Sequence, residues 1–96
     1  MKKKIDIIMP HYKENKETIM TALSSINCQT GIDFSRVNVT VVTDGIENKL
    51  DFSNEKFNFK FNNLIKDEEY HSAGTTRQYG VDRTNNDFIL FFDIFY

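Results

Sequence analysis

The sequence has few residues that cross-link a fold or interrupt regular structure, with one cysteine, one proline and four glycines. It has no tryptophan. The lone cysteine, Cys28, cannot form an internal disulfide, which argues against a disulfide-rich secreted protein. It sits in a helical pattern and is expected to be a small core residue. No segment approaches the roughly 20 apolar residues of a transmembrane helix. The apolar stretch 5–9 is too short for a signal peptide, so we expect a cytoplasmic chain.

An excess of positive charge is also missing. The net charge is −2, whereas a nucleic-acid-binding protein would normally show a basic face. The lysines at positions 2–4 are interpreted as a solvated tail. The 96 residues, 40% of them hydrophobic, are expected to form one soluble domain spanning 1–96. A chain of this size buries roughly 60–65% of its unfolded surface and can hold a core without staples.

Apolar periodicity predicts alternating strands and helices. The predicted strands are 5–9, 37–42, 57–61 and 88–92, and the predicted helices are 15–29 and 72–84. Phenylalanine and polar residues alternate strictly in 57–61. This pattern is typical of an edge strand with one face toward solvent and its phenylalanines facing the core. The continuous apolar run 88–92 predicts a strand covered on both faces. The order β-α-β-β-α-β indicates the α/β class, a mostly parallel sheet with flanking helices.

Three predicted strands end in residues that suggest a binding site. The strands lead into Pro10-His11-Tyr12, Thr43-Asp44-Gly45 and Asp93. In open α/β sheets, ligands bind beyond the carboxyl ends of the strands, so these groups converge on one crevice if the strands are neighbours. His11 and His71 are interpreted as polar loop residues rather than as acid–base groups, and Glu68 and Glu69 as surface charge.

The usual phosphate-binding signatures are absent. No G-x-G-x-x-G follows the first strand, and no G-x-x-x-x-G-K-[ST] occurs, which argues against a dinucleotide-binding domain and a P-loop NTPase. An acidic crevice without a glycine-rich loop must hold a nucleotide differently. A divalent cation on a carboxylate can neutralise a diphosphate, and a separate aspartate can accept hydrogen bonds from a base or ribose.

Four stretches, in order, carry a resemblance to a known family. They are Ile5-Asp-Ile-Ile-Met-Pro-His-Tyr12, Thr21-Ala-Leu-Ser-Ser-Ile-Asn-Cys-Gln-Thr30, Val39-Thr-Val-Val-Thr-Asp-Gly45, and Gly74-Thr-Thr-Arg-Gln-Tyr-Gly-Val81 continuing through Asp87-Phe-Ile-Leu-Phe-Phe-Asp93. Together they resemble the N-terminal, nucleotide-binding half of a family 2 inverting glycosyltransferase with the GT-A fold. Each motif alone is weak, but four in order at plausible spacings form a fairly specific signal.

The resemblance implies roles for the matching positions. Pro10 and Tyr12, with His11 between them, would lie beside the uridine of a UDP-type nucleotide sugar. Asp44, followed by Gly45, would contact the base, while Thr43 replaces the first acidic residue of that motif. Arg77 would bind the acidic strand end or a phosphate. Asp93 would be the first aspartate of a D-x-D motif, close to the ribose and to Mg²⁺ or Mn²⁺.

The sequence departs from the family pattern at its end. Phe95 stands where the second aspartate of D-x-D would ligate the metal, and phenylalanine offers no oxygen ligand. In the family, the catalytic base and the acceptor-binding half lie downstream of this motif. We therefore expect a donor-binding half truncated at the D-x-D motif, with doubtful metal binding and no glycosyl transfer by the chain alone.

Two other readings remain open. The chain could be a non-catalytic module that self-associates through its last strand, because an uncovered apolar edge invites pairing with another copy. It could also be a flavodoxin-like or receiver-like domain. A receiver would need an acidic pair after the first strand, where this sequence has Met9-Pro10-His11, so this third reading ranks lowest.

Overall fold

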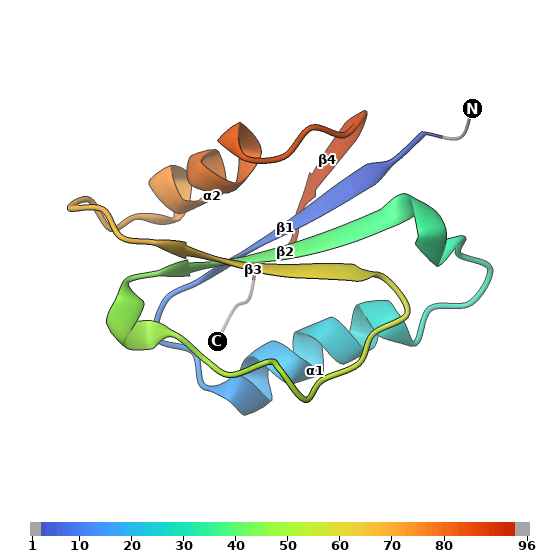
Figure 1. Ribbon diagram of the computed structural model, residues 1–96, viewed down its shortest axis with the longest axis horizontal. Helices are drawn as coiled ribbons and strands as arrows, with labels where there is room; N and C mark the ends of the chain where they lie inside the picture. Colours follow the sequence, from blue (N-terminus) through green and yellow to red (C-terminus); the bar gives the residue numbers. More distant parts are fainter. Residues whose placement is uncertain (1–2, 94–96) are drawn as a thin grey trace.

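A parallel sheet organises the protein, which a computed structural model describes over residues 3–93 (Figure 1). Its strands are β1 (Ile5–His11), β2 (Val37–Asp44), β3 (Lys60–Lys66) and β4 (Phe88–Phe91), in the order β3-β2-β1-β4. Every neighbouring pair is parallel. Helices α1 (Lys16–Asn27) and α2 (Ala73–Asp82) connect the strands, with short 3₁₀ turns at Phe34–Arg36 and Ile46–Asn48. The predicted α/β class is confirmed.

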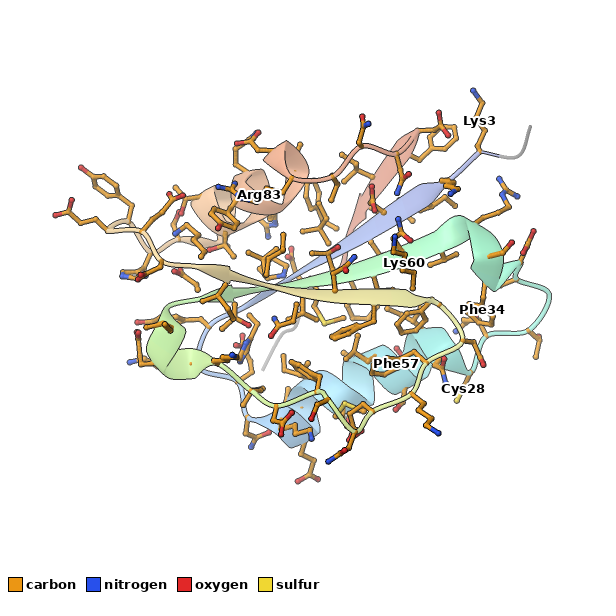
Figure 2. All side chains as sticks on the ribbon, viewed as in Figure 1. Lys3, Cys28, Phe34, Phe57, Lys60 and Arg83 are labelled. Atoms are coloured by element: carbon orange, nitrogen blue, oxygen red, sulfur yellow. The ribbon has the colours of Figure 1, made fainter. Side chains whose placement is uncertain are left out.

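Helix α1 covers one face of the sheet. The Asn15 side chain caps its start by accepting a 2.9 Å hydrogen bond from the Thr18 backbone N–H. Ile19, Leu23 and Ile26 form its buried face and pack with the inward residues of β1 and β2. The helix ends two residues earlier than predicted. Cys28 follows as the capping residue and is exposed, so its assignment to the core is wrong (Figure 2).

Helix α2 covers the opposite face and carries the chain from the β3 edge to the β4 edge (Figure 1). A reciprocal capping box between Ser72 and Thr75 begins it. Gly80 lies directly over β1 and β2, where its missing side chain lets helix and sheet approach closely. No helix within residues 3–93 combines the length and apolar character needed to cross a membrane.

Replacing Gly80 with alanine is expected to lower the free energy of unfolding by about 1–3 kcal/mol through overpacking. The added Cβ would lie 2.9 Å from Ile8 Cγ2 and 3.0 Å from Val42 Cγ2. Gly74→Ala in the same helix is the matched control, because its Cβ would meet nothing closer than Ser72 Oγ at 3.9 Å. Urea denaturation of both variants checks the prediction, and equal midpoints would contradict it.

Strand β3 lies at the sheet edge as predicted, but its predicted bounds are wrong. The phenylalanine alternation suggested 57–61, whereas the strand runs over 60–66. Phe57 and Phe59 precede the strand and stack on each other, with ring centroids 4.9 Å apart. Phe59 is part of the buried core and Phe57 packs against that core from a loop near α1 (Figure 2). The alternation of phenylalanines therefore reflects aromatic packing. The polar residues of β3 hide its strand character from the sequence pattern.

Strand β4 is the other edge, and the expectation that both its faces are covered is wrong. Its four side chains, Phe88, Ile89, Leu90 and Phe91, are between 37% and 56% exposed. β4 pairs with β1 alone among the described strands, and helix α2 packs over β1, β2 and β3, so little covers the faces of β4.

Candidate functional site

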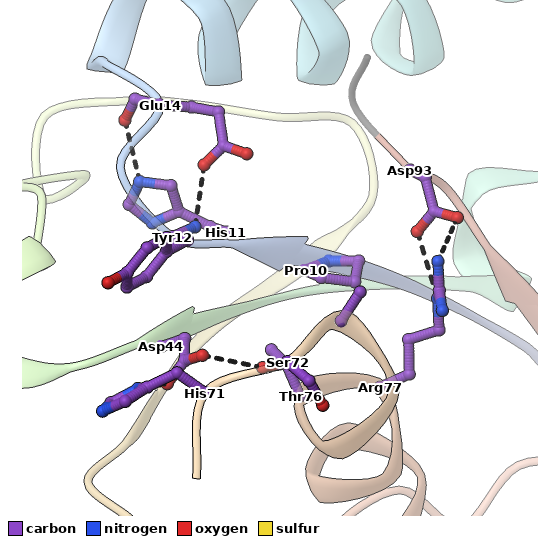
Figure 3. Close-up of a pocket in the computed structure, with 11 residues that line it drawn as sticks. Pro10, His11, Tyr12, Glu14, Asp44, His71, Ser72, Thr76, Arg77 and Asp93 are labelled. Carbon is purple, nitrogen blue, oxygen red and sulfur yellow. Dashed lines mark hydrogen bonds and ion pairs between the residues drawn. The ribbon is translucent and has the colours of Figure 1, made fainter.

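A cavity of about 240 Å³ opens at the carboxyl ends of the strands (Figure 3). The chain winds from β1 outward to β3 and then returns to place β4 on the far side of β1. Such a reversal is a topological switch point, where α/β sheets bind ligands. The predicted convergence of three strand ends is confirmed. The lining residues are Pro10, His11, Tyr12, Glu14, Asp44, His71, Ser72, Ala73, Thr76, Arg77 and Asp93.

Asp44 is the most heavily bonded side chain of this cavity. Its Oδ1 accepts a 2.7 Å hydrogen bond from His71 Nδ1 and lies 3.4 Å from Lys66 Nζ. Its Oδ2 accepts a hydrogen bond from Thr76 Oγ1 at 3.2 Å. The residue is only 3% exposed. Asp44 therefore ties together the ends of β2 and β3, the segment before α2, and α2 itself.

Lys66 is a site residue that sequence reasoning missed, since the third predicted strand stopped at residue 61. Its side chain is 0% exposed, and its ammonium group contacts Asp44 and donates to the Tyr70 carbonyl oxygen. A buried ammonium group is tolerated when it is paired and hydrogen-bonded. The signal that could have found it is the strand pairing, because Lys66 lies directly opposite Asp44 in the β2–β3 register.

Arg77 and Asp93 form the opposite wall of the cavity (Figure 3). Arg77 Nε donates to Asp93 Oδ1 at 3.1 Å, and Nη2 donates to Oδ2, so the pair is bidentate. Both side chains remain about one-third exposed, at 32% and 29%. The expectation that Arg77 binds the acidic strand end is confirmed, and the pair remains open to exchange with a ligand.

The carboxylate that the family resemblance assigns to a metal ion, Asp93, is paired with an arginine in this structure. Both Asp93 oxygens are engaged by the Arg77 guanidinium. Over residues 3–93, no group of three or more histidine, cysteine, aspartate or glutamate side chains is placed to hold a metal. Mg²⁺ and Mn²⁺ require several oxygen ligands. Phe95, the position predicted to lack a metal-ligating oxygen, lies outside the described residues.

His11 and Gly45 have structural roles at the strand ends. His11 was interpreted as a loop residue, but it is the buried last residue of β1. Its ring bonds to Thr43 Oγ1 at 3.0 Å and to the Glu14 carbonyl oxygen at 2.8 Å. Gly45 is absent from the cavity lining and shapes the turn after β2 with φ of 101°, a conformation that favours glycine.

Tyr12 and His71 form an aromatic side of the cavity. Their ring centroids are 6.0 Å apart with planes inclined by 31°, and both residues are partly exposed. The Glu14 carboxylate holds the Tyr12 backbone by accepting its N–H at 2.7 Å. His71 was interpreted as an ordinary polar residue, whereas the structure places it beside Tyr12 and in contact with Asp44 (Figure 3).

The fold and cavity define a parallel α/β protein with a ligand-sized opening at its switch point. No protein-family model and no curated protein matches the chain. The chemistry of the cavity comprises an aromatic side, a buried carboxylate network and an exchangeable arginine–aspartate pair.

Proposed function

We propose that this chain binds the nucleotide part of a UDP-type nucleotide sugar, as the donor-binding half of a family 2 inverting glycosyltransferase with the GT-A fold. The observation that carries the proposal is the single cavity shared by Tyr12, Asp44, Arg77 and Asp93. The resemblance in sequence assigns these same positions to one nucleotide site. Three of them come from strand ends and one from α2.

The cavity offers a separate contact for each part of the ligand. A base can stack on the Tyr12 ring, which is 41% exposed. A diphosphate can bind the Arg77 guanidinium, whose planar donors suit phosphate oxygens. Arg77 would exchange Asp93 for the phosphate, and the partial exposure of both side chains lets water solvate the released carboxylate.

Donor binding without turnover is the proposed activity of this chain. Inverting transfer requires a carboxylate that takes the proton of the acceptor hydroxyl. The three carboxylates that line the cavity already accept protein hydrogen bonds: Asp44 from His71, Asp93 from Arg77, and Glu14 from the Tyr12 backbone. We therefore assign binding and orientation of the donor to these residues.

Isothermal titration calorimetry with UDP tests this function, with ADP as the control ligand. We expect a one-to-one complex with a dissociation constant below about 1 mM for UDP, equivalent to about 4 kcal/mol of binding free energy. ADP should bind more weakly because its purine is larger than the base assigned to Tyr12. The absence of heat with UDP, in a folded sample, would contradict the proposal.

The exposed apolar edge favours a second candidate, a non-catalytic module that self-associates. All four side chains of β4 are exposed, and the strand leaves its outer backbone groups unpaired within the described chain. Such edges template pairing with another strand. A concentration-dependent dimer in sedimentation experiments, combined with no response to UDP, would favour this candidate over donor binding.

A further inference from the structure

Asp44 is placed to act on a ligand through another residue rather than directly. A carboxylate offers about four lone-pair sites. Lys66, His71 and Thr76 supply a donor each, and only 3% of the residue is exposed. A nucleoside in the cavity could reach little of this carboxylate. The sequence resemblance implies a direct contact between Asp44 and the base. A contact made by one of the hydrogen-bond partners of Asp44 is therefore favoured over it.

His71 is the partner that reaches the cavity. Lys66 is fully buried and Thr76 is 2% exposed, whereas the His71 side chain is 43% exposed and lines the opening beside Tyr12 (Figure 3). One ring nitrogen, Nδ1, is held by Asp44 at 2.7 Å. The other, Nε2, has no hydrogen-bond partner among residues 3–93. Half of the ring is fixed by the protein and half is available to a ligand.

The bond to Asp44 determines the chemistry of the available nitrogen. A carboxylate only accepts hydrogen bonds, so Nδ1 must carry the hydrogen. In the neutral ring, Nε2 is then an acceptor with a free lone pair. A uridine nucleotide presents two kinds of donor that match it, the imide N3–H of uracil and the ribose hydroxyl groups.

We propose that His71 contacts the nucleoside directly and that Asp44 is its positioning residue. Nε2 of His71 accepts a hydrogen bond from the uracil imide or from the ribose 2′-hydroxyl, while Asp44 sets the tautomer and the ring orientation. This inference rests on the proposed binding of a UDP-type nucleotide. It adds a base- or ribose-reading residue that the sequence patterns did not indicate.

Two substitutions at His71 separate ligand contact from structural support. In His71→Asn, the amide nitrogen can keep the bond to Asp44, but nothing remains at the Nε2 position. In His71→Gln, the amide can reach the Nε2 position but loses the bond to Asp44. We expect His71→Asn to weaken UDP binding about 10-fold at unchanged stability, as expected for one lost hydrogen bond. His71→Gln should retain part of the affinity. Unchanged UDP affinity in His71→Asn, together with a loss of affinity in His71→Gln, would overturn the inference.

The ligand series CDP, 2′-deoxy-UDP and UDP identifies the donor. Cytosine lacks the N3–H, so a base contact predicts that CDP binds wild type about 10-fold more weakly than UDP, and that His71→Asn removes this preference. A ribose contact predicts the same pattern for 2′-deoxy-UDP. If wild type discriminates against neither ligand, or if the preference survives in His71→Asn, the inference fails.

The tautomer of the free protein tests the positioning role that is assigned to Asp44. Two-bond ¹H–¹⁵N NMR spectra of the wild-type histidines should show His71 protonated at Nδ1 when the ring is neutral, and an Nε2–H tautomer would overturn the inference. The proposed function can fail separately. Wild-type protein that does not bind UDP refutes both proposals, whereas wild-type binding with unaffected His71→Asn refutes only the role of His71.

Discussion

Replacing Asp44 with alanine is expected to lower the free energy of unfolding by about 3–5 kcal/mol, because it leaves the Lys66 ammonium buried without its counterion. Lys66 is 0% exposed, and Asp44 is the carboxylate it contacts. The total stability of a domain of this size is about 5–14 kcal/mol, so the loss is a large fraction of it. Urea denaturation followed by circular dichroism measures the effect, with an unchanged slope indicating an intact unfolding transition.

The paired variant Asp44→Asn with Lys66→Met is the control for this prediction. It removes both charges while nearly keeping both volumes, and neutral replacement of a buried ion pair is often close to neutral in stability. We therefore expect the double variant to be more stable than Asp44→Ala, and the two sites to be coupled in a double-mutant cycle. A loss below about 1 kcal/mol in Asp44→Ala would show that the Lys66 charge does not depend on this partner, since such a loss is ordinary for a surface change.

Replacing Arg77 with methionine is expected to weaken UDP binding about 10- to 100-fold, because a charge-assisted hydrogen bond to phosphate is worth about 1.5–3 kcal/mol. Methionine keeps much of the arginine stem and removes only the guanidinium. Uridine is the matched control ligand. It lacks phosphates, so its affinity should not change between wild type and Arg77→Met. Calorimetry at two salt concentrations should also show that the wild-type preference for UDP over uridine declines with salt.

Replacing Asp93 with asparagine is expected to have the opposite effect on UDP affinity. It releases Arg77 from the charge it binds in the free protein. UDP affinity in metal-free buffer should rise by up to about 5-fold, since a partly exposed ion pair is worth about 0–1 kcal/mol. Equal losses of uridine and UDP binding in Arg77→Met would contradict the assignment of Arg77 to the diphosphate.

The fold could be predicted where local patterns and tertiary packing agree. The apolar stripe Ile19, Leu23 and Ile26 faces the core as expected, and Asn15 caps that helix. At β3 the local pattern and the tertiary packing disagree. Phe57 and Phe59 pack from a loop before the strand, while the strand itself carries Asn62 and Asn63. At β4 the apolar run was correct for a strand but gave no information about its place at the sheet edge.

The site was only partly readable from the sequence for the same reason. The end of a strand can be recognised from the local sequence. The positions around Pro10, Asp44 and Asp93 could therefore be identified, and they do share one cavity. The partners of Asp44 could not, because Lys66 reaches it through strand register and His71 through the path of the chain before α2. Such contacts depend on the tertiary arrangement, which no local pattern encodes.

The central claim is that the switch-point cavity binds a uridine nucleotide. The most direct measurement is a ¹H–¹⁵N correlation spectrum of the isolated chain, titrated with UDP. We expect saturable shifts concentrated at backbone amides of the cavity, among them Tyr12, Asp44, His71 and Arg77. Residues at the opposite end of the sheet, such as Ile5 and Val37, should stay unchanged. A well-dispersed spectrum in which these amides do not respond to UDP would contradict it.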